Sequence, residues 1–234
     1  MLLIDTISLK KLSDVFLLIL RRNLRPEALE WLLNKMDLII KEEKSVQLHL
    51  CFAHLPRFAT KQTFEVLDQE VKQIECHLAG FTIHNWTLDK LSRVWLLMQI
   101  PSEHKEIYLK KINSLFATAE MNEQIVLYTA LPLYNYPEEW VARCEEGIRS
   151  NIGTVLEAIM YHNPYPAQFL SEPSWNQLVL KAFFTEKDVN QIIGLKERMN
   201  ENLSATLQDY IQERLAASRT VAPEIYQLTQ QMNP

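Results

Sequence analysis

Glycine is scarce in this chain. Four of the 234 residues are glycine, whereas an average composition would give about 16. Tight β-hairpins, dinucleotide-binding turns and phosphate-binding loops depend on glycine, because it adopts positive φ angles without a steric cost. The composition therefore disfavours β-barrels, dinucleotide-binding folds and P-loop nucleotidases, and it favours an all-α protein.

Apolar residues recur at helical spacing along most of the chain. The pattern predicts about ten helices of roughly 10–18 residues with short connections. One of these helices is predicted over residues 61–78, ending near Gly80. Residues 81–86 are predicted to form a loop or a short extended segment. The first helix, over residues 8–22, places on one face Leu9, Leu12, Val15, Phe16 and Ile19.

Residues 137–162 form the longest helical pattern. At 100° per residue, five apolar side chains fall within about 80° of one another, namely Cys144, Ile148, Ile152, Val155 and Ile159. Gly147 and Gly153 lie inside this segment, and each costs about 1 kcal/mol relative to alanine in a helix. Either these glycines permit close helix packing, or the helix breaks near Ser150.

A run of short helices with short connections is typical of two architectures. One is a helical array, a solenoid-like right-handed stack of helices, and the other is a compact helical bundle. No Gly/Ser-rich or low-complexity linker divides the sequence. We therefore expect a single all-helical domain over residues 1–234, in either architecture.

The charge balance limits the kinds of partner. The chain has 24 Lys and Arg against 29 Asp and Glu, a formal net charge of −5. This disfavours nucleic acid, because phosphate binding needs clustered basic residues, and it disfavours a strongly basic membrane-binding surface. The longest apolar run near the N-terminus, residues 15–20, is far shorter than the roughly 20 residues that span a bilayer. We expect no secretory signal and no transmembrane segment, and peripheral membrane contact stays open.

The cysteines fit a reducing compartment. Cys51, Cys76 and Cys144 are odd in number and widely spaced, which predicts no disulfide framework and favours the cytoplasm. The best metal-ligand candidates are Cys51 with His49 and His54, but the two histidines would lie about 140° apart on a helix. We interpret Cys51 as a core residue and expect neither a metal nor a cofactor. No nucleotide-binding, zinc-protease or nucleophile-elbow motif is present.

Polar residues in a mostly apolar setting mark a first candidate binding region. Pro164 and Pro166 favour extended geometry at the residues before them. The polar groups either cap neighbouring turns, because buried polar groups need partners, or they form a rigid pocket floor for a polar small molecule or a partner's backbone. The candidates are His162, Asn163, Tyr165, Trp175, Asn176, Gln177 and Lys181.

A second candidate set lies on two other helices. Its members are Arg143, Glu146 and Ser150, opposite the apolar stripe, and Tyr210 and Arg214, four residues apart. For Tyr210 and Arg214 the alternative is a solvated helix face. We predict that the stripe at Arg143 lines one concave surface with Lys181 and Arg214.

Several blocks together resemble the EboA family. They are residues 147–151 (GIRSN), 163–166 (NPYP) and 175–184 (WNQLVLKAFF), and the pattern of Tyr210, Glu213, Arg214 and Arg219. The resemblance covers about residues 86–221. The chain departs from the family pattern at Leu215, where a bulkier residue such as Trp is common, and at Ser218, where glycine is common.

The resemblance implies an accessory protein of a bacterial gene cluster that moves a secondary-metabolite precursor from cytoplasm to periplasm. Implied partners are the other proteins of the ebo cluster, among them a membrane prenyltransferase, and a small-molecule metabolite. The resemblance supplies no catalytic residue, and we expect a non-enzymatic helical adaptor, cytoplasmic or membrane-associated through a partner. The alternative is an enzyme acting on a lipid-linked or polycyclic metabolite, with Lys181, His162, Glu146 or Tyr165 as acid/base groups.

Overall fold

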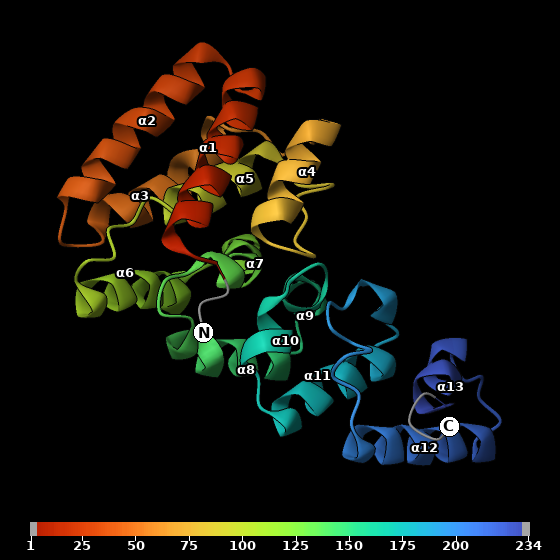
Figure 1. The fold of residues 1–234 in the computed structure, drawn as a ribbon. Coiled ribbons are helices and arrows are strands. Elements are labelled where there is room, and N and C mark those ends of the chain that lie inside the picture. Colours follow the sequence, from red (N-terminus) through yellow and green to blue (C-terminus); the bar gives the residue numbers. More distant parts are fainter. Residues whose placement is uncertain (1–3, 231–234) are drawn as a thin grey trace. The chain divides into compact units, whose positions relative to one another are not determined.

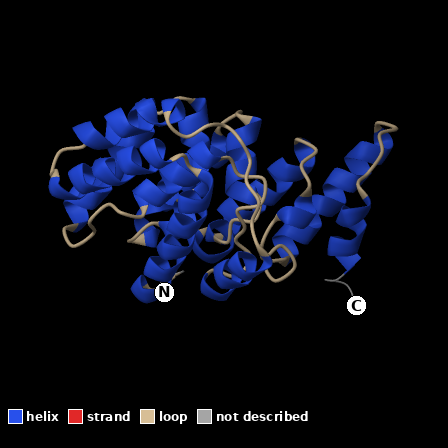
Figure 2. Ribbon diagram, turned by 90° about the horizontal axis from the view of Figure 1, so that it is seen from above, coloured by secondary structure: helices blue, strands red, loops and turns tan. Residues whose placement is uncertain are grey.

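The computed structural model describes residues 4–230 as a helical protein (Figures 1 and 2). Within these residues it has thirteen α-helices, four short 3₁₀ helices and no β-strand, apart from two isolated β-bridges. The predicted all-α class is confirmed. The choice between a helical array and a bundle stays a prediction.

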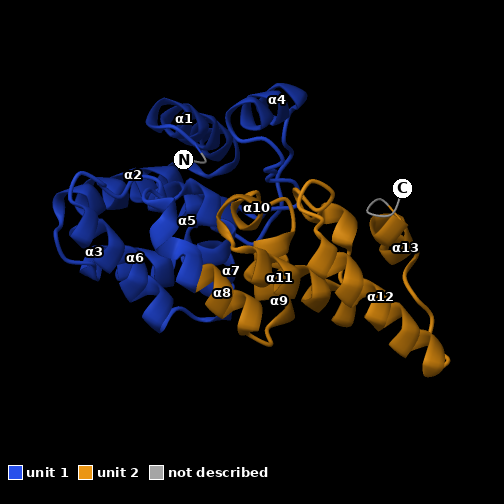
Figure 3. Ribbon diagram, turned by 60° about the horizontal axis from the view of Figure 1, so that its bottom comes forward, with its two compact units in different colours: residues 1–142 blue, residues 143–234 orange. Residues whose placement is uncertain are grey.

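Contacts divide the chain into two compact units, residues 1–142 and 143–234 (Figure 3). That the whole chain acts as one domain stays a prediction. The first unit contains α1 (Thr6–Asn23), α2 (Pro26–Lys41), α3 (Val46–His54), η1 (Leu55–Arg57), α4 (Asp68–His77), α5 (Leu88–Leu97), α6 (Lys105–Thr118), α7 (Met121–Thr129), η2 (Leu131–Leu133) and η3 (Pro137–Trp140). The helices that follow are α8 (Val141–Arg149), α9 (Gly153–Met160), α10 (Tyr165–Phe169), α11 (Glu172–Phe184), η4 (Val189–Gln191), α12 (Glu201–Ala216) and α13 (Pro223–Gln230).

The core of the first unit is built around α1 and α5. Helix α1 contacts α4 and α5, and most of its predicted stripe is buried, whereas Leu9 is only half-buried. The side chain of Asp5 accepts hydrogen bonds from the backbone N–H groups of Ile7 and Ser8, which fixes the start of α1. Aspartate satisfies free N–H groups at this position.

Residues 61–67 are not helical, so the helix predicted over residues 61–78 begins later, at Asp68. The N–H of Leu88 donates to the carbonyl of Gln62 at 3.0 Å, and the N–H of Asp89 donates to that of Thr60 at 3.2 Å. These are two of the first N–H groups of α5, which have no partner within their own helix. The stretch before α4 is therefore held in a non-helical conformation by the start of α5.

The helical pattern of residues 137–162 breaks at Ser150, the second of the two alternatives. Helix α8 ends at Arg149 and α9 begins at Gly153. Of the predicted stripe, Cys144, Ile148, Val155 and Ile159 are buried, and Ile152, in the break, is half-buried. Further along, α11 contacts α12 and α12 contacts α13, so the last helices pack in chain order.

A bidentate ion pair joins α1 to α4. The two terminal nitrogens of Arg22 lie 2.5 and 3.0 Å from the carboxylate oxygens of Glu70, and the N–H of Leu67 donates to the same carboxylate at 2.9 Å. Burial of Glu70 acts to raise its pKa, but the bonds from Arg22 and Leu67 outweigh it, and the pKa of Glu70 lies below its ordinary value. The ionised carboxylate therefore stabilises the fold.

We expect Glu70→Gln to lower the free energy of unfolding by about 1–2 kcal/mol at pH 7, because it leaves Arg22 without its charged partner. The deficit should shrink as the pH falls through the lowered pKa of Glu70, since protonation then removes the same charge from the parent protein. Urea unfolding at pH 7 and at pH 3.5 tests this, with the exposed Glu30→Gln as control. Equal stability of all three proteins at pH 7 would contradict the assignment.

Candidate functional site

The polar stripe of α8 is paired within its own helix. Arg143 donates to Glu146 at 2.7 Å, an i, i+3 pair in which the side chain of Glu146 is 57% exposed. On the neighbouring face, Glu145 accepts a hydrogen bond from the hydroxyl of Ser174 at 2.6 Å. Exposed pairs of this kind contribute little to stability, and a binding role for Arg143 and Glu146 stays a prediction.

Lys181 binds the end of α8. Its Nζ donates to the carbonyls of Ile148 at 2.5 Å and Ser150 at 2.7 Å. These carbonyls lie where the helix has no internal donors and where its dipole favours a positive charge. Burial lowers the pKa of Lys181. The structure thus brings Lys181 and Ser150 together through backbone oxygens.

Asn163 closes the turn between α9 and α10. Its amide nitrogen donates to the carbonyl of Ala158 at 3.0 Å, and its amide oxygen accepts from the N–H of Tyr165 at 3.1 Å. Tyr165 is fully buried and stacks on Phe169. The predicted extended geometry at Tyr165 was wrong, because α10 begins at Tyr165. Pro166 occupies the second position of α10. Proline fits there because the first N–H groups of a helix have no acceptor within it, so the N–H that proline lacks costs no hydrogen bond.

Trp175 lies fully buried in α11 beside an arginine that sequence reasoning missed. Its indole Nε1 has no hydrogen-bond partner among the described residues, and the guanidinium of Arg198 lies 4.9 Å from the ring centroid. Arg198 also donates to three carbonyls at the end of α10, those of Pro166, Ala167 and Leu170. Nothing in the local pattern around Arg198 indicates partners some thirty positions earlier in the chain.

The remaining residues of the first candidate region are spread over different contacts. The amides of Asn176 and Asn200 donate to each other, at 3.1 and 2.9 Å. Gln177 is exposed on α11. His162 has a positive φ of 49°, and its N–H donates to the carbonyl of Gln191 at 2.9 Å. A binding role for these side chains stays a prediction.

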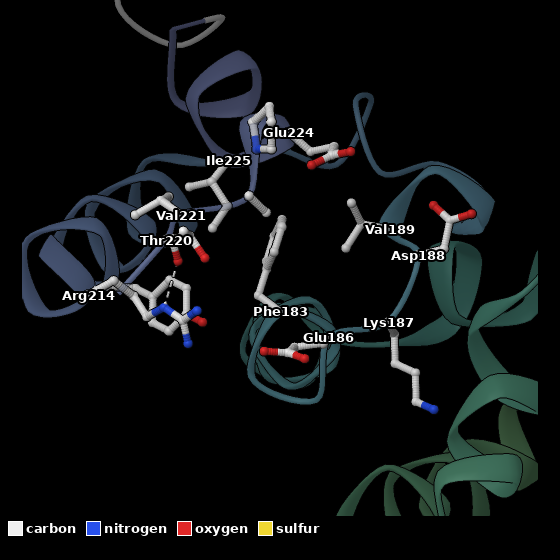
Figure 4. A pocket seen from close by; sticks show the side chains of 13 residues that line it. Phe183, Glu186, Lys187, Asp188, Val189, Arg214, Thr220, Val221, Glu224 and Ile225 are labelled. Carbon is white, nitrogen blue, oxygen red and sulfur yellow. Dashed lines mark hydrogen bonds between the residues drawn. The ribbon is translucent and has the colours of Figure 1, made fainter. Parts of the chain in front are cut away.

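Tyr210 and Arg214 line an open cleft of about 500 Å³ between α11, α12 and α13 (Figure 4). The Nε of Arg214 donates to the carbonyl of Thr220 at 3.0 Å, and its guanidinium lies 5.8 Å from the ring centroid of Tyr210. Phe184 meets the same ring edge-on. Of the twelve predicted binding residues, these two line the cleft, so the described residues do not gather the whole set in one cavity.

Two helices next to this cleft end in strained residues. Glu186, after α11, has φ 53°, and Ser218, after α12, has φ 54°. Each lies in the C′ position of a Schellman motif. The N–H of the residue after Glu186 donates to the carbonyl of Ala182, and the N–H of the residue after Ser218 donates to the carbonyl of Arg214. The left-handed conformation costs a residue other than glycine roughly 1–2 kcal/mol.

A second cleft of about 500 Å³ lies within the first unit. Arg93 on its wall pairs with Asp89 at 3.0 Å and donates twice to the carbonyl of Phe52. His49 is bound to the hydroxyls of Ser114 and Thr118. The polar groups named here are thus occupied by neighbouring parts of the fold.

The cysteines differ in accessibility. Cys51 and Cys144 are buried and Cys76 is exposed, and none forms a disulfide. Burial raises the pKa of Cys51 to about 12 and raises that of Cys144 as well. Over residues 4–230, no three His, Cys, Asp or Glu side chains are placed to hold a metal ion.

The two asparagines allow a graded test. Asn163→Ala should cost about 1–3 kcal/mol of unfolding free energy, because it leaves a buried carbonyl and a buried N–H unsatisfied. Asn176→Ala should cost about 1 kcal/mol or less, because Asn200 keeps its bond to the N–H of Leu203 and water reaches the half-buried site. Chemical denaturation measures both. A larger loss for Asn176→Ala would refute this account.

Ser218→Gly should stabilise the protein by about 1 kcal/mol, since glycine adopts φ 54° without strain. For a chain of this size that corresponds to a rise in Tm of roughly 2–4 °C, measurable by calorimetry. Ser218→Ala is the matched control and should bring no gain, because alanine keeps the same steric conflict. An unchanged Tm in both variants would show that the strain is absent.

Comparison with known proteins places the chain in a family. The family model described as "Metabolite traffic protein EboA" matches residues 12–230, nearly the whole chain and well beyond the blocks at residues 86–221. Neither a curated protein nor a solved structure matches significantly. In the described part of the chain no helix combines the length and the apolar character needed to cross a membrane. The chain belongs to the EboA family of metabolite traffic proteins.

Proposed function

We propose that this protein is a non-enzymatic helical adaptor in the traffic of a secondary metabolite. It binds a metabolite or another protein of the ebo cluster, of which the membrane prenyltransferase is one, and so assists export of a precursor to the periplasm. The proposal places it in the cytoplasm, associated with the membrane through a partner. The family match supports a role in metabolite traffic, and the adaptor mechanism is our inference.

One observation carries the adaptor proposal: three side chains that could serve as acid or base are bound, buried or paired within the fold, and none of them lines the open cleft at Arg214. Lys181 is bound to two carbonyls, Tyr165 is fully buried, and Glu146 is paired with Arg143. General acid–base catalysis needs a group within hydrogen-bond reach of substrate. The geometry thus favours binding over the alternative, an enzyme acting on a lipid-linked or polycyclic metabolite.

Affinity capture tests this function. The tagged protein, isolated from its host under mild conditions, should retain cluster proteins, a small molecule, or both, identified by mass spectrometry. Arg214→Gln should reduce this yield severalfold, because Arg214 lines the open cleft, whereas Arg149→Gln, an exposed residue of α8, should not.

Two results would overturn the adaptor proposal. One is capture that recovers neither a cluster protein nor a small molecule. The other is chemical conversion of the captured metabolite by the purified protein alone, with loss of turnover in Lys181→Met. That second result would establish the enzyme alternative.

A further inference from the structure

The cleft at Arg214 continues along α13 into a neighbouring cavity. This neighbouring cavity has a volume of about 410 Å³ and is lined by residues of the segment 189–197 and by α13. Both cavities are lined by Val189 and Glu224, so they adjoin. We call the two together the α13 hollow. Each is in the size range of small-molecule sites.

The α13 hollow has an apolar floor, and charged and polar side chains complete its lining. Buried side chains from four segments line it, namely Phe183, Val189, Ile192, Leu195, Ile225 and Leu228. In Figure 4 the ring of Phe183 stands in the middle of the cleft, with Ile225 and Val189 around it. A planar apolar molecule would find aromatic and aliphatic surface there.

The rim holds one half-buried cation with unused donors. Arg214 is fixed by its Nε bond to Thr220 and by the ring of Tyr210, but in the described part of the chain neither of its Nη atoms has a hydrogen-bond or ion-pair partner. Lys187 is instead bound to Glu157. A guanidinium with two free NH₂ groups fits a carboxylate in a bidentate pair.

Carboxylates occupy the other sides of the rim. Figure 4 shows Asp188 and Glu224 across Phe183 from Arg214, with Glu186 below the ring. Glu186 and Glu224 have no ion-pair partner among the residues that the structure describes. A simple anion would meet repulsion on this side, whereas a protonated amine would be attracted.

We infer that the α13 hollow binds an amphipathic zwitterion with a planar aromatic body. Its carboxylate pairs with Arg214, its body lies against Phe183, and its protonated amine faces Glu186 and Glu224. This inference rests on the proposed binding function and names the class of ligand.

Three rigid probes test the ligand class: 4′-(aminomethyl)biphenyl-4-carboxylate, its analogue with methyl in place of aminomethyl, and its analogue with methyl in place of carboxylate. Calorimetric titration should give the zwitterion a Kd at least tenfold lower than either analogue, because each charged contact adds affinity. Equal affinity of the three probes, or no binding of any, would overturn the inference.

Three variants test the site. Arg214→Gln should weaken the zwitterion about tenfold and leave the amine-only probe unchanged. Glu186→Gly should weaken the zwitterion severalfold while Tm rises by roughly 2–4 °C, a combination that general damage to the fold would not produce. Ala222→Trp should block the cleft and prevent binding of the zwitterion, because Ala222 is an exposed residue of the cleft wall. Ala205→Trp, on the exposed side of α12, is the control and should bind the zwitterion like the parent protein.

The same variants separate this inference from the proposed function. If Ala222→Trp binds the zwitterion like the parent protein, the site is elsewhere and the inference is wrong. If no probe binds but the parent protein captures cluster proteins, the inference is wrong and the adaptor function stands. Loss of both capture and probe binding in the parent protein would refute both.

Discussion

Backbone carbonyls at the ends of short helices are the constraint on which much of this structure depends. Every α-helix ends in four carbonyls without internal partners, and a chain of short helices has many such ends. Four cationic side chains bind them: Lys111 at the end of α2, Arg93 at α3, Lys181 at α8 and Arg198 at α10. Burial lowers the pKa of Lys111, Lys181 and Arg198. The effect of burial prevails because these cations bind neutral carbonyl oxygens more than carboxylates, and a neutral acceptor offsets the burial of a charge less.

This constraint explains what could be predicted from the sequence. Periodicity reports which side of a helix faces the core, so the all-α class and the buried face of α1 were predictable. The break at Ser150 was one of two alternatives that Gly147 and Gly153 left open, because periodicity runs through the break. Periodicity does not report where a donor finds its acceptor. Residues 61–67 are non-helical because of α5, which follows them, and Arg198 reaches carbonyls of residues 166–170. Such long-range partners leave no local signal.

The same reasoning applies to the candidate site. A polar residue in an apolar segment must have a partner, but the rule does not distinguish a helix end from a ligand. Asn163 and Lys181 bind backbone carbonyls. Arg214, on a helix whose pattern is also that of a solvated surface, has no partner for its two Nη atoms among residues 4–230. We therefore base the proposed site on a residue whose hydrogen-bonding capacity exceeds the demands of the described fold.

The burial of two of the three cysteines has a practical consequence. Thiol reagents attack the thiolate, and burial suppresses it at Cys51 and Cys144, whereas Cys76 is exposed near the end of α4. At neutral pH the natural sequence therefore behaves as a single-cysteine protein toward a maleimide dye. A fluorophore or spin label can be attached there without mutagenesis, far along the chain from the residues of the α13 hollow.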